Sequence, residues 1–258
     1  MQSLNLAGGP IEYQMWGNKD DRTGPTWVML HEGLGSVAMW RDFPQQLAEF
    51  LQAPVVAYSR HGYGNSAPAR RPRAVSYMHD EALIVLPEFL RELGIERPFL
   101  FGHSDGGSIA LIYASEHPVQ GVIALAPHVF VEELSVQSIA AAKVAYETTS
   151  LRERLGRYHA DVDGAFWGWN DIWLHPDFRS WNIAALLPRI RAPILVIQGK
   201  QDEYGTEEQL RSIAERADEV DVSLLPECRH SPHRDQAVRV LETVRSWSEA
   251  KCNSGRRS

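Results

Sequence analysis

Five short, uninterrupted apolar runs constrain the fold of this chain more than any other feature. They occupy residues 27–30, 55–58, 99–101, 122–125 and 194–197. Strands covered on both faces of a parallel sheet lack the polar alternation of half-exposed strands, and these runs lack it too. Stretches with helical spacing separate the runs. The sequence therefore predicts an α/β fold with a mostly parallel sheet, right-handed crossovers and flanking helices.

Three helical patterns and one hairpin complete this outline. Helices are predicted over residues 77–93, 108–117 and 237–247. In the first of these, apolar residues recur at three- and four-residue spacings, as expected of one buried face: Leu83, Leu86, Leu90 and Leu93. Near the N-terminus, residues 4–6 and 11–16 flank a turn-forming Gly-Gly-Pro sequence and are predicted to pair as a hairpin.

A long stretch without a clear strand separates the fourth apolar run from the fifth. Parts of it have helical character, and a structureless loop of about sixty residues would be unusual in a compact domain. We therefore expect residues 128–187 to form a helical cap inserted after the sixth strand, over one end of the sheet. Residues 1–127 and 188–250 then form the α/β core, and residues 251–258 form a disordered tail.

Composition and charge disfavour several classes of function. The chain has 26 Lys and Arg against 33 Asp and Glu, a net charge of −7, which does not suit binding to a nucleic-acid backbone. No apolar run approaches the roughly 18 residues of a membrane helix. Neither a signal peptide nor a disulfide framework is recognisable. We expect a cytoplasmic protein without a membrane or nucleic-acid partner, and the oligomeric state stays open.

The strongest local motif is Gly102-His103-Ser104-Asp105-Gly106, which matches G-x-S-x-G. An apolar strand precedes the motif and a helix follows it, which is the setting of a nucleophile elbow. Glycines on both sides of the serine accommodate a strained turn. The N-terminus of the following helix favours developing negative charge. The Ser104 hydroxyl is therefore the candidate nucleophile.

A serine nucleophile needs a base to take its proton and an acid to orient that base. Two loops that follow late strands offer both, at the sheet edge where ligands of open α/β sheets gather. For the acid, G-x-x-D spacing after an apolar strand favours Asp202; the competitors are Glu203, Glu132 and Glu133. For the base, the main candidates are His230, His233 and His128.

Taken together, these segments resemble the α/β-hydrolase superfamily over nearly the full length of the chain. The resemblance rests on residues 30–36, residues 58–66, the Ser104 motif and the two late loops. It implies a triad of Ser104 as nucleophile, His230 as base and Asp202 as acid. Within the superfamily, the chain is similar to serine hydrolases with a helical cap, such as enol-lactonases, meta-cleavage product hydrolases and small-ester esterases.

The same resemblance implies an oxyanion hole made of two backbone N–H groups. Asp105 follows the nucleophile and supplies one donor, and Gly33 in the loop after the third strand supplies the other. Glu32 departs from the commoner His-Gly beginning of this loop. A carboxylate facing the oxyanion would be unfavourable, so we expect the Glu32 side chain to turn away or to be hydrogen-bonded.

Candidate substrate contacts lie beside these groups and in the insertion: Leu34, His103, Trp167, Trp169 and Trp173. Aromatic faces over Ser104 would bind a flat apolar group, although the same tryptophans are equally suited to holding a short cap together. His159, Asp161 and Asp163 could be drawn as a metal cluster. A solvated loop is the favoured interpretation, and we expect no metal in the site.

The sequence therefore predicts a cofactor-independent serine hydrolase that cleaves a small carboxylic ester, thioester or lactone through an acyl-enzyme on Ser104. The nearest alternative uses the same site to hydrolyse a carbon–carbon bond in a vinylogous diketone from aromatic catabolism. A less favoured alternative is a ligand sensor that kept the fold and does not turn over. The expected partner is a small-molecule substrate, and the cap slightly favours an aromatic or apolar acyl group.

Overall fold

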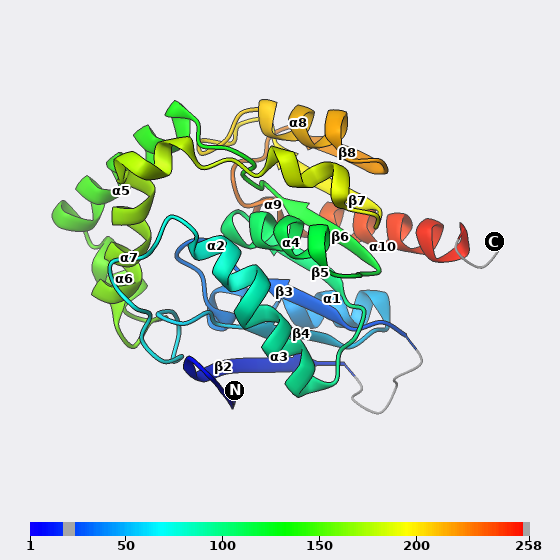
Figure 1. Cartoon of the computed structure of the whole chain (residues 1–258), viewed down its shortest axis with the longest axis horizontal. Coiled ribbons are helices and arrows are strands. Elements are labelled where there is room, and N and C mark those ends of the chain that lie inside the picture. Colours follow the sequence, from blue (N-terminus) through cyan, green and yellow to red (C-terminus); the bar gives the residue numbers. More distant parts are fainter. Residues whose placement is uncertain (18–23, 255–258) are drawn as a thin grey trace.

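The computed structural model describes residues 1–17 and 24–254 of the 258-residue chain. Within these residues, an eight-stranded sheet has the order β1-β2-β4-β3-β5-β6-β7-β8 (Figure 1). The strands are β1 (Gln2–Leu6), β2 (Gly9–Trp16), β3 (Trp27–Leu30), β4 (Val55–Tyr58), β5 (Phe99–His103), β6 (Gly121–Leu125), β7 (Ile194–Gly199) and β8 (Val220–Leu225). β2 pairs antiparallel with both β1 and β4, and the other neighbours pair parallel. The predicted α/β fold and the N-terminal hairpin are confirmed.

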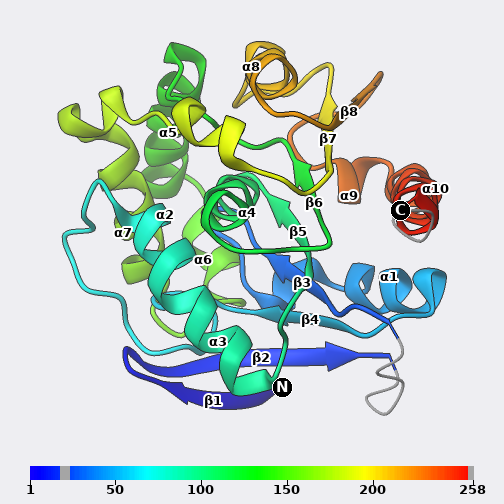
Figure 2. The ribbon, with the colours of Figure 1, turned by 45° about the vertical axis from the view of Figure 1, so that its right-hand side comes forward.

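Side chains on the two faces of each central strand belong to two separate hydrophobic cores. In β3, Val28 and Leu30 belong to one core, and Trp27 and Met29 belong to the other. Helices α3, α4 and α8 cover the first core, and α1 and α10 cover the second (Figure 2). Their bounds are α1 (Phe43–Leu51), α3 (Leu86–Leu93), α4 (Asp105–Glu116), α8 (Glu208–Arg216) and α10 (Ala237–Ser254). Burial on both faces explains the continuous apolar runs.

A π turn interrupts the helix predicted over residues 77–93. Helix α2 (Tyr77–Asp80) continues into the π turn η2 (Glu81–Val85) and then into α3. Because a π turn accommodates an extra residue, it rotates the side chains before it relative to those after it. Leu83 is 38% exposed, whereas Leu86 is fully buried. The prediction that Leu83 shares one buried face with the later leucines is therefore wrong.

The segment between β6 and β7 is helical, as predicted. It contains α5 (Glu133–Thr148), α6 (Leu151–Leu155), α7 (Val162–Leu174) and the 3₁₀ turns η3 (Pro176–Ser180) and η4 (Ala184–Arg189). Helices α5, α6 and α7 pack against one another at the end of the molecule farthest from the C-terminal end of α10 (Figure 1). The turn η4 packs instead on α4 and α8. We call residues 128–187 the cap segment.

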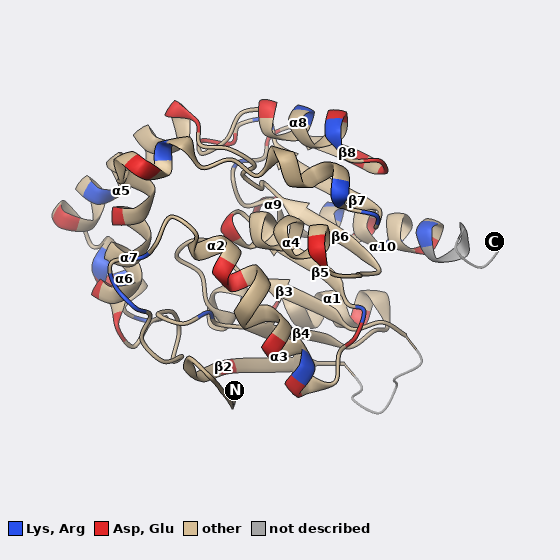
Figure 3. Ribbon diagram, in the orientation of Figure 1, with Lys and Arg blue, Asp and Glu red and all other residues tan. Residues whose placement is uncertain are grey.

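The C-terminal helix is longer than predicted. Because α10 continues to Ser254, the expected disordered tail does not begin at residue 251; residues 255–258 lie outside the described part of the chain. Two short elements remain, η1 (Val37–Trp40) and α9 (Pro232–Asp235). Lys and Arg are interspersed with Asp and Glu along the outer helices (Figure 3). Among the described residues, no helix is both long and apolar enough to cross a membrane.

Candidate active site

Ser104 lies in a tight turn between β5 and α4. Its backbone has φ 53° and ψ −118°, a positive φ that is unusual for a residue other than glycine. Close packing holds the turn, because a Cβ on Gly102 would overlap the Gly106 carbonyl and a Cβ on Gly106 would overlap the Leu30 carbonyl. The Ser104 N–H donates to the Leu125 carbonyl of β6 over 2.9 Å. The strand–turn–helix setting predicted for the motif is therefore present.

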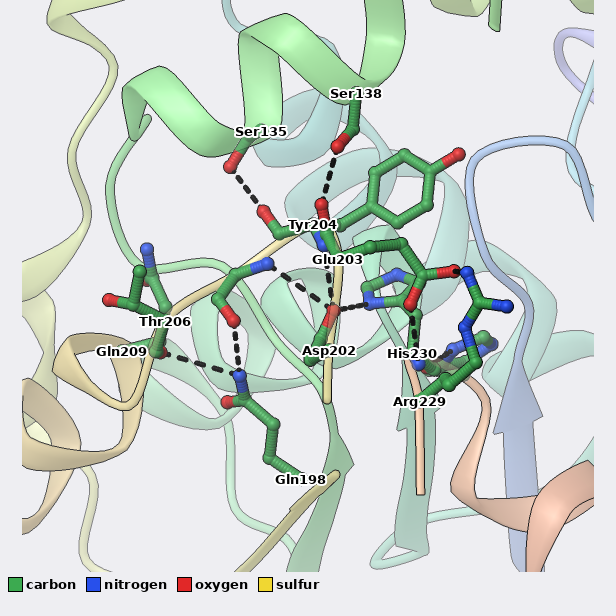
Figure 4. A network of polar contacts seen from close by, with 12 residues as sticks. Ser135, Ser138, Gln198, Asp202, Glu203, Tyr204, Thr206, Gln209, Arg229 and His230 are labelled. Carbon is green, nitrogen blue, oxygen red and sulfur yellow. Dashed lines mark hydrogen bonds and ion pairs between the residues drawn. The ribbon is translucent and has the colours of Figure 1, made fainter. Parts of the chain in front are cut away.

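Asp202 and His230 meet beyond the carboxyl ends of β7 and β8. Oδ1 of Asp202 accepts a hydrogen bond from Nδ1 of His230 over 2.8 Å, and a second from the Tyr204 N–H, also over 2.8 Å (Figure 4). Burial would raise the pKa of Asp202, but the charge and hydrogen bond of His230 outweigh it and lower the pKa below its usual value. Because Nδ1 of His230 donates to the carboxylate, Nε2 is left to accept a proton.

The loop after Asp202 is fastened to the cap segment. Two hydroxyl groups of α5 donate to backbone carbonyls of this loop: Ser135 to Tyr204 over 2.6 Å and Ser138 to Glu203 over 2.5 Å (Figure 4). These bonds join a cap helix directly to the turn that positions the Asp202 carboxylate.

The other candidate acids have different partners. Glu132 accepts hydrogen bonds from the backbone and the hydroxyl of Thr206. Glu133 forms an exposed ion pair with an arginine of η3. Glu203 accepts from the backbone N–H of His230 over 3.3 Å and does not contact its ring nitrogens. Asp202 is thus the carboxylate that orients the His230 imidazole.

The Ser104 hydroxyl and the His230 imidazole lie in the same region but are not hydrogen-bonded. The ring centroids of His230 and His103, the residue before Ser104, are 5.2 Å apart. Within the described residues, the side-chain hydrogen bond of His230 goes to Asp202. Proton transfer requires an approach of roughly 2.6–3.2 Å, and in unliganded enzymes such contacts often tighten only when substrate binds.

His103, expected as a substrate contact, supports the loop that carries His230. Its Nε2 donates to the His230 carbonyl over 2.7 Å, and its Nδ1 lies 3.6 Å from Oε2 of Glu32. Oε1 of Glu32 accepts from Arg234 over 3.0 Å. Burial would raise the pKa of Glu32, but the nearby His103 and the positive charge of Arg234 hold it well below its usual value. The expectation that Glu32 is hydrogen-bonded is confirmed.

Asp105 has two long-range partners that the local sequence pattern did not reveal. Its Oδ2 accepts a hydrogen bond from Oη of Tyr77 over 2.8 Å and lies 3.7 Å from Nη1 of Arg60. All three side chains are buried. Burial raises the pKa of Tyr77, and the negative charge of Asp105 raises it further. The helix N-terminus is therefore not the only group that stabilises the Asp105 carboxylate.

Gly33 is in direct contact with the cap segment. A Cβ at this position would overlap Nε1 of Trp169 on α7, so the observed packing requires glycine. The next carbonyl, that of Leu34, accepts from Nε2 of His159 over 2.9 Å, and Nδ1 of His159 accepts from the Gly64 N–H over 3.0 Å. His159 is 5% exposed, so the interpretation of its segment as a solvated loop is wrong for this residue.

Two of the three predicted tryptophan contacts lie beside site residues. Trp169 contacts Gly33, and the ring of Trp173 is 5.0 Å from that of His128, which in turn is 5.9 Å from the ring of His230. Burial, together with the charge of His230, lowers the pKa of His128 to about 4, so this imidazole is neutral near pH 7. Trp167, by contrast, packs against α5.

The three residues considered as a metal cluster, His159, Asp161 and Asp163, have separate structural roles. Asp161 accepts from the Gly164 N–H over 2.8 Å and caps α7, and Asp163 pairs with Arg152. Among the described residues, no group of three or more His, Cys, Asp or Glu side chains is arranged to hold a metal ion.

Comparison with known proteins decides the family. The profile described as "Alpha/beta hydrolase family" matches residues 27–243. The chain belongs to the α/β-hydrolase family. Two solved structures with this fold illustrate the likeness. Proline iminopeptidase from Mycobacterium smegmatis has a TM-score of 0.80 at 16% identity, covering 98% of this chain and 99% of that one. The enol-lactonase from Burkholderia xenovorans LB400 has a TM-score of 0.75 at 20% identity, covering 94% and 98%.

Sequence relatives match different shares of the chain. Human serine hydrolase BPHL is 25% identical over 237 residues, which is 88% of this chain and 79% of that protein. The putative carbamate hydrolase RutD from Caulobacter vibrioides is 34% identical over 115 residues, which is 44% of this chain and 36% of that protein. The match thus spans about a third of the length of that relative. The solved structures establish the fold alone, and the reaction of an enzyme with this fold depends on the residues of its site.

Proposed function

We propose that this α/β-hydrolase family member is a cofactor-independent serine hydrolase that cleaves a small carboxylic ester, thioester or lactone through an acyl-enzyme on Ser104. The observation that carries the proposal is the hydrogen bond between Asp202 and His230, formed at the sheet edge where Ser104 occupies its strained turn. A nucleophile, an imidazole and an orienting carboxylate are the groups that acyl transfer to serine uses.

In this mechanism, Nε2 of His230 takes the Ser104 proton while the hydroxyl oxygen attacks the substrate carbonyl. Asp202 holds the imidazole in the required tautomer and stabilises the imidazolium that forms. His230 then gives the proton to the leaving group, and an acyl-enzyme remains. Water attacks this intermediate with His230 again as base, which releases the acid and regenerates Ser104.

The backbone N–H groups of Gly33 and Asp105 are the proposed donors to the tetrahedral oxyanion. Asp105 is the first residue of α4, so its N–H has no acceptor inside the helix and points along a dipole that favours negative charge. Within the described residues, the Gly33 N–H has no hydrogen-bond acceptor. Losing one oxyanion donor typically costs roughly 10²–10³-fold in rate.

The cap segment, residues 128–187, is proposed to cover the substrate, with residues 1–127 and 188–250 as the core that carries the chemistry. Trp169 and Trp173 lie beside Gly33 and His128, and both are almost fully buried. Small-molecule sites are lined mostly by apolar and aromatic side chains, with a few polar groups that orient the ligand. This placement supports a substrate with an aromatic or apolar portion.

A fluorophosphonate probe tests the nucleophile. We expect wild-type protein to be labelled on Ser104 and to release p-nitrophenol in a burst from a p-nitrophenyl ester. Ser104→Ala should abolish labelling and lower kcat by roughly 10⁶-fold, while circular dichroism shows an unchanged fold. Wild-type turnover by Ser104→Ala would exclude the mechanism.

A substrate panel separates the reactions that this site could perform. An ester, a thioester, a lactone and a vinylogous diketone are compared on wild type and Ser104→Ala. Turnover of the diketone alone would assign carbon–carbon bond hydrolysis instead of ester cleavage. Binding without turnover of any compound, together with no probe labelling, would identify a ligand sensor.

A further inference from the structure

Buried hydrogen-bond donors without acceptors gather beside the proposed nucleophile. They are Nε and Nη2 of Arg73, Oη of Tyr63 and Nη1 of Arg60, and none of these atoms has a hydrogen-bond partner within the described residues. Tyr63 is 1% exposed and Arg60 is 2% exposed. Because buried polar groups in folded proteins are almost always satisfied, a cluster of unsatisfied donors points to a ligand.

Aromatic rings hold Arg73 in place without satisfying its N–H groups. Its Cζ lies 4.7 Å from the ring centroid of Tyr63 and 5.5 Å from that of Tyr77. The Cζ of Arg60 lies 5.1 Å from the same Tyr63 ring. Contact with a π face stabilises a guanidinium cation, yet the in-plane N–H groups still require acceptors.

Arg60 has a compensating carboxylate, but Arg73 does not. Asp105 lies 3.7 Å from Arg60 and accepts a hydrogen bond from Tyr77. The nearby Glu81 accepts a hydrogen bond from a tyrosine of β4. In the described part of the chain, Arg73 forms no ion pair, although two of its nitrogens are buried. A partly buried positive charge is therefore left for an anion to pair with.

Arg73 lies between the nucleophile turn and the cap segment. On one side, Tyr77 connects it to Asp105, the residue after Ser104. On the other side, a Cβ added to Gly168 of α7 would lie 3.0 Å from Nε of Arg73. The next cap residue, Trp169, contacts Gly33 of the proposed oxyanion hole. Arg73 is thus linked to the nucleophile turn through Tyr77 and lies against the α7 residue that precedes Trp169.

We propose that Arg73, assisted by the Tyr63 hydroxyl, binds a carboxylate of the substrate. The substrates are then small molecules that carry a free carboxylate in addition to the ester, thioester or lactone carbonyl attacked by Ser104. The planar fork of arginine matches the two oxygens of a carboxylate, and the carboxylate supplies the acceptors and the negative charge that Arg73 lacks. This assignment of substrate class rests on the proposed hydrolase function.

Matched pairs of substrates test the assignment in turnover. On the acyl side the pair is mono-4-nitrophenyl adipate and its terminal amide, and on the leaving-group side it is 4-acetoxybenzoate and 4-acetoxybenzamide. Wild type should prefer the acid of at least one pair. Arg73→Gln should lower that preference in kcat/KM by roughly 10- to 100-fold, mainly through KM, because a charge-assisted hydrogen-bond pair is lost.

Control variants separate this role from general effects of charge and folding. Arg70→Gln removes the same charge from an exposed position in the same loop and should retain the wild-type preference. Arg73→Lys keeps the charge without the fork and should lose less preference than Arg73→Gln. Tyr63→Phe removes one donor and retains the ring that contacts Arg73. If Arg73→Gln does not fold, the lysine and Tyr63→Phe variants carry the test.

A binding measurement distinguishes failure of this proposal from failure of the hydrolase function. Calorimetry with Ser104→Ala should show tighter binding of the acid than of the amide, and the added Arg73→Gln change should weaken acid binding by roughly 10- to 100-fold. Equal binding of acid and amide, or a preference that survives Arg73→Gln, overturns the assignment. Arg73-dependent binding without turnover by wild type would instead overturn the hydrolase function and leave the carboxylate site standing.

Discussion

The imidazole of His103 donates from Nε2 to the backbone carbonyl of His230 over 2.7 Å. The residue immediately before the proposed nucleophile therefore holds the loop that carries the proposed base, although the two are far apart in the sequence. Glu32, 3.6 Å from the other nitrogen of His103, extends this contact to the loop that contains Gly33. The proposed nucleophile, base and oxyanion donor are thus joined through one buried histidine.

Replacing His103 tests this positioning role. His103→Ala removes the hydrogen bond to the His230 carbonyl and should lower kcat by roughly 10²-fold, because displacement of a catalytic group by about 1 Å has costs of that size. KM should change much less. The amide of His103→Gln can donate to the same carbonyl and should restore part of kcat. Equal kcat values for the two variants, measured with both folded, would contradict the role.

The assignment of Asp202 as the orienting acid makes a second prediction. Asp202→Asn should lower kcat by about 10⁴-fold, because the amide favours the wrong tautomer of His230. Steady-state kinetics with a p-nitrophenyl ester measure the effect. Glu133→Gln changes an exposed competitor for the same role and should have little effect. A large decrease in kcat in Glu133→Gln, together with a small decrease in Asp202→Asn, would assign the role of orienting acid to Glu133.

Contact between Gly33 and the cap segment gives a third prediction. In Gly33→Ala the new methyl group would overlap Nε1 of Trp169, so either the loop or α7 must move. Activity should fall by roughly 10²-fold or more, the cost of a displaced oxyanion donor. Trp169→Phe removes the indole nitrogen and should recover part of the activity in the double variant. Gly156→Ala, whose added Cβ stays 3.4 Å from its neighbours, is the matched control and should behave like wild type.

Buried histidines predict how stability depends on pH. Burial lowers the pKa of His128 to about 4, whereas an unfolded histidine titrates near 6.5. The unfolded state therefore binds a proton first as the pH falls. The stabilising contribution is present above pH 6.5 and is lost as the pH falls towards 4. Between pH 7.5 and 5 this site should reduce the free energy of unfolding by about 2 kcal/mol.

Urea unfolding of wild type and His128→Asn at these two pH values measures that contribution. Between pH 7.5 and 5, the free energy of unfolding should fall more in wild type than in the variant. This comparison holds regardless of how much the substitution itself destabilises the protein at pH 7.5. Burial also lowers the pKa of His31 and of His233, so the variant should retain part of the acid sensitivity. Identical losses in the two proteins would show that His128 is not the group responsible.

The sheet and the motif loops could be predicted from sequence because each depends on local patterns. Continuous apolar runs identified the parallel strands, and those strands are buried on both faces. The glycines around Ser104 indicated the strained turn, and the spacing after β7 indicated Asp202 as the partner of the proposed base, His230. Its hydrogen bond to His230 agrees with that prediction.

Other features depend on tertiary packing and left no local signal. The π turn η2 changes which leucines are buried, but its residues read as ordinary helix. Asp105 is paired with Arg60 and Tyr77, which approach from distant segments. His159 lies in a polar stretch yet bridges two loops in the interior. Such residues are identified by the partners that surround them, and a pattern in one segment does not contain those partners.

The hydrogen bonds from Ser135 and Ser138 to the loop after Asp202 restrict how the cap segment can move. Helix α5 cannot shift as a rigid body without either breaking these bonds or carrying residues 203 and 204 with it. The Tyr204 N–H donates to the carboxylate that orients His230, so a shift of the helix would be transmitted to that carboxylate. Any ligand that displaced α5 would therefore also alter the orientation of the proposed base, through the loop that carries Asp202.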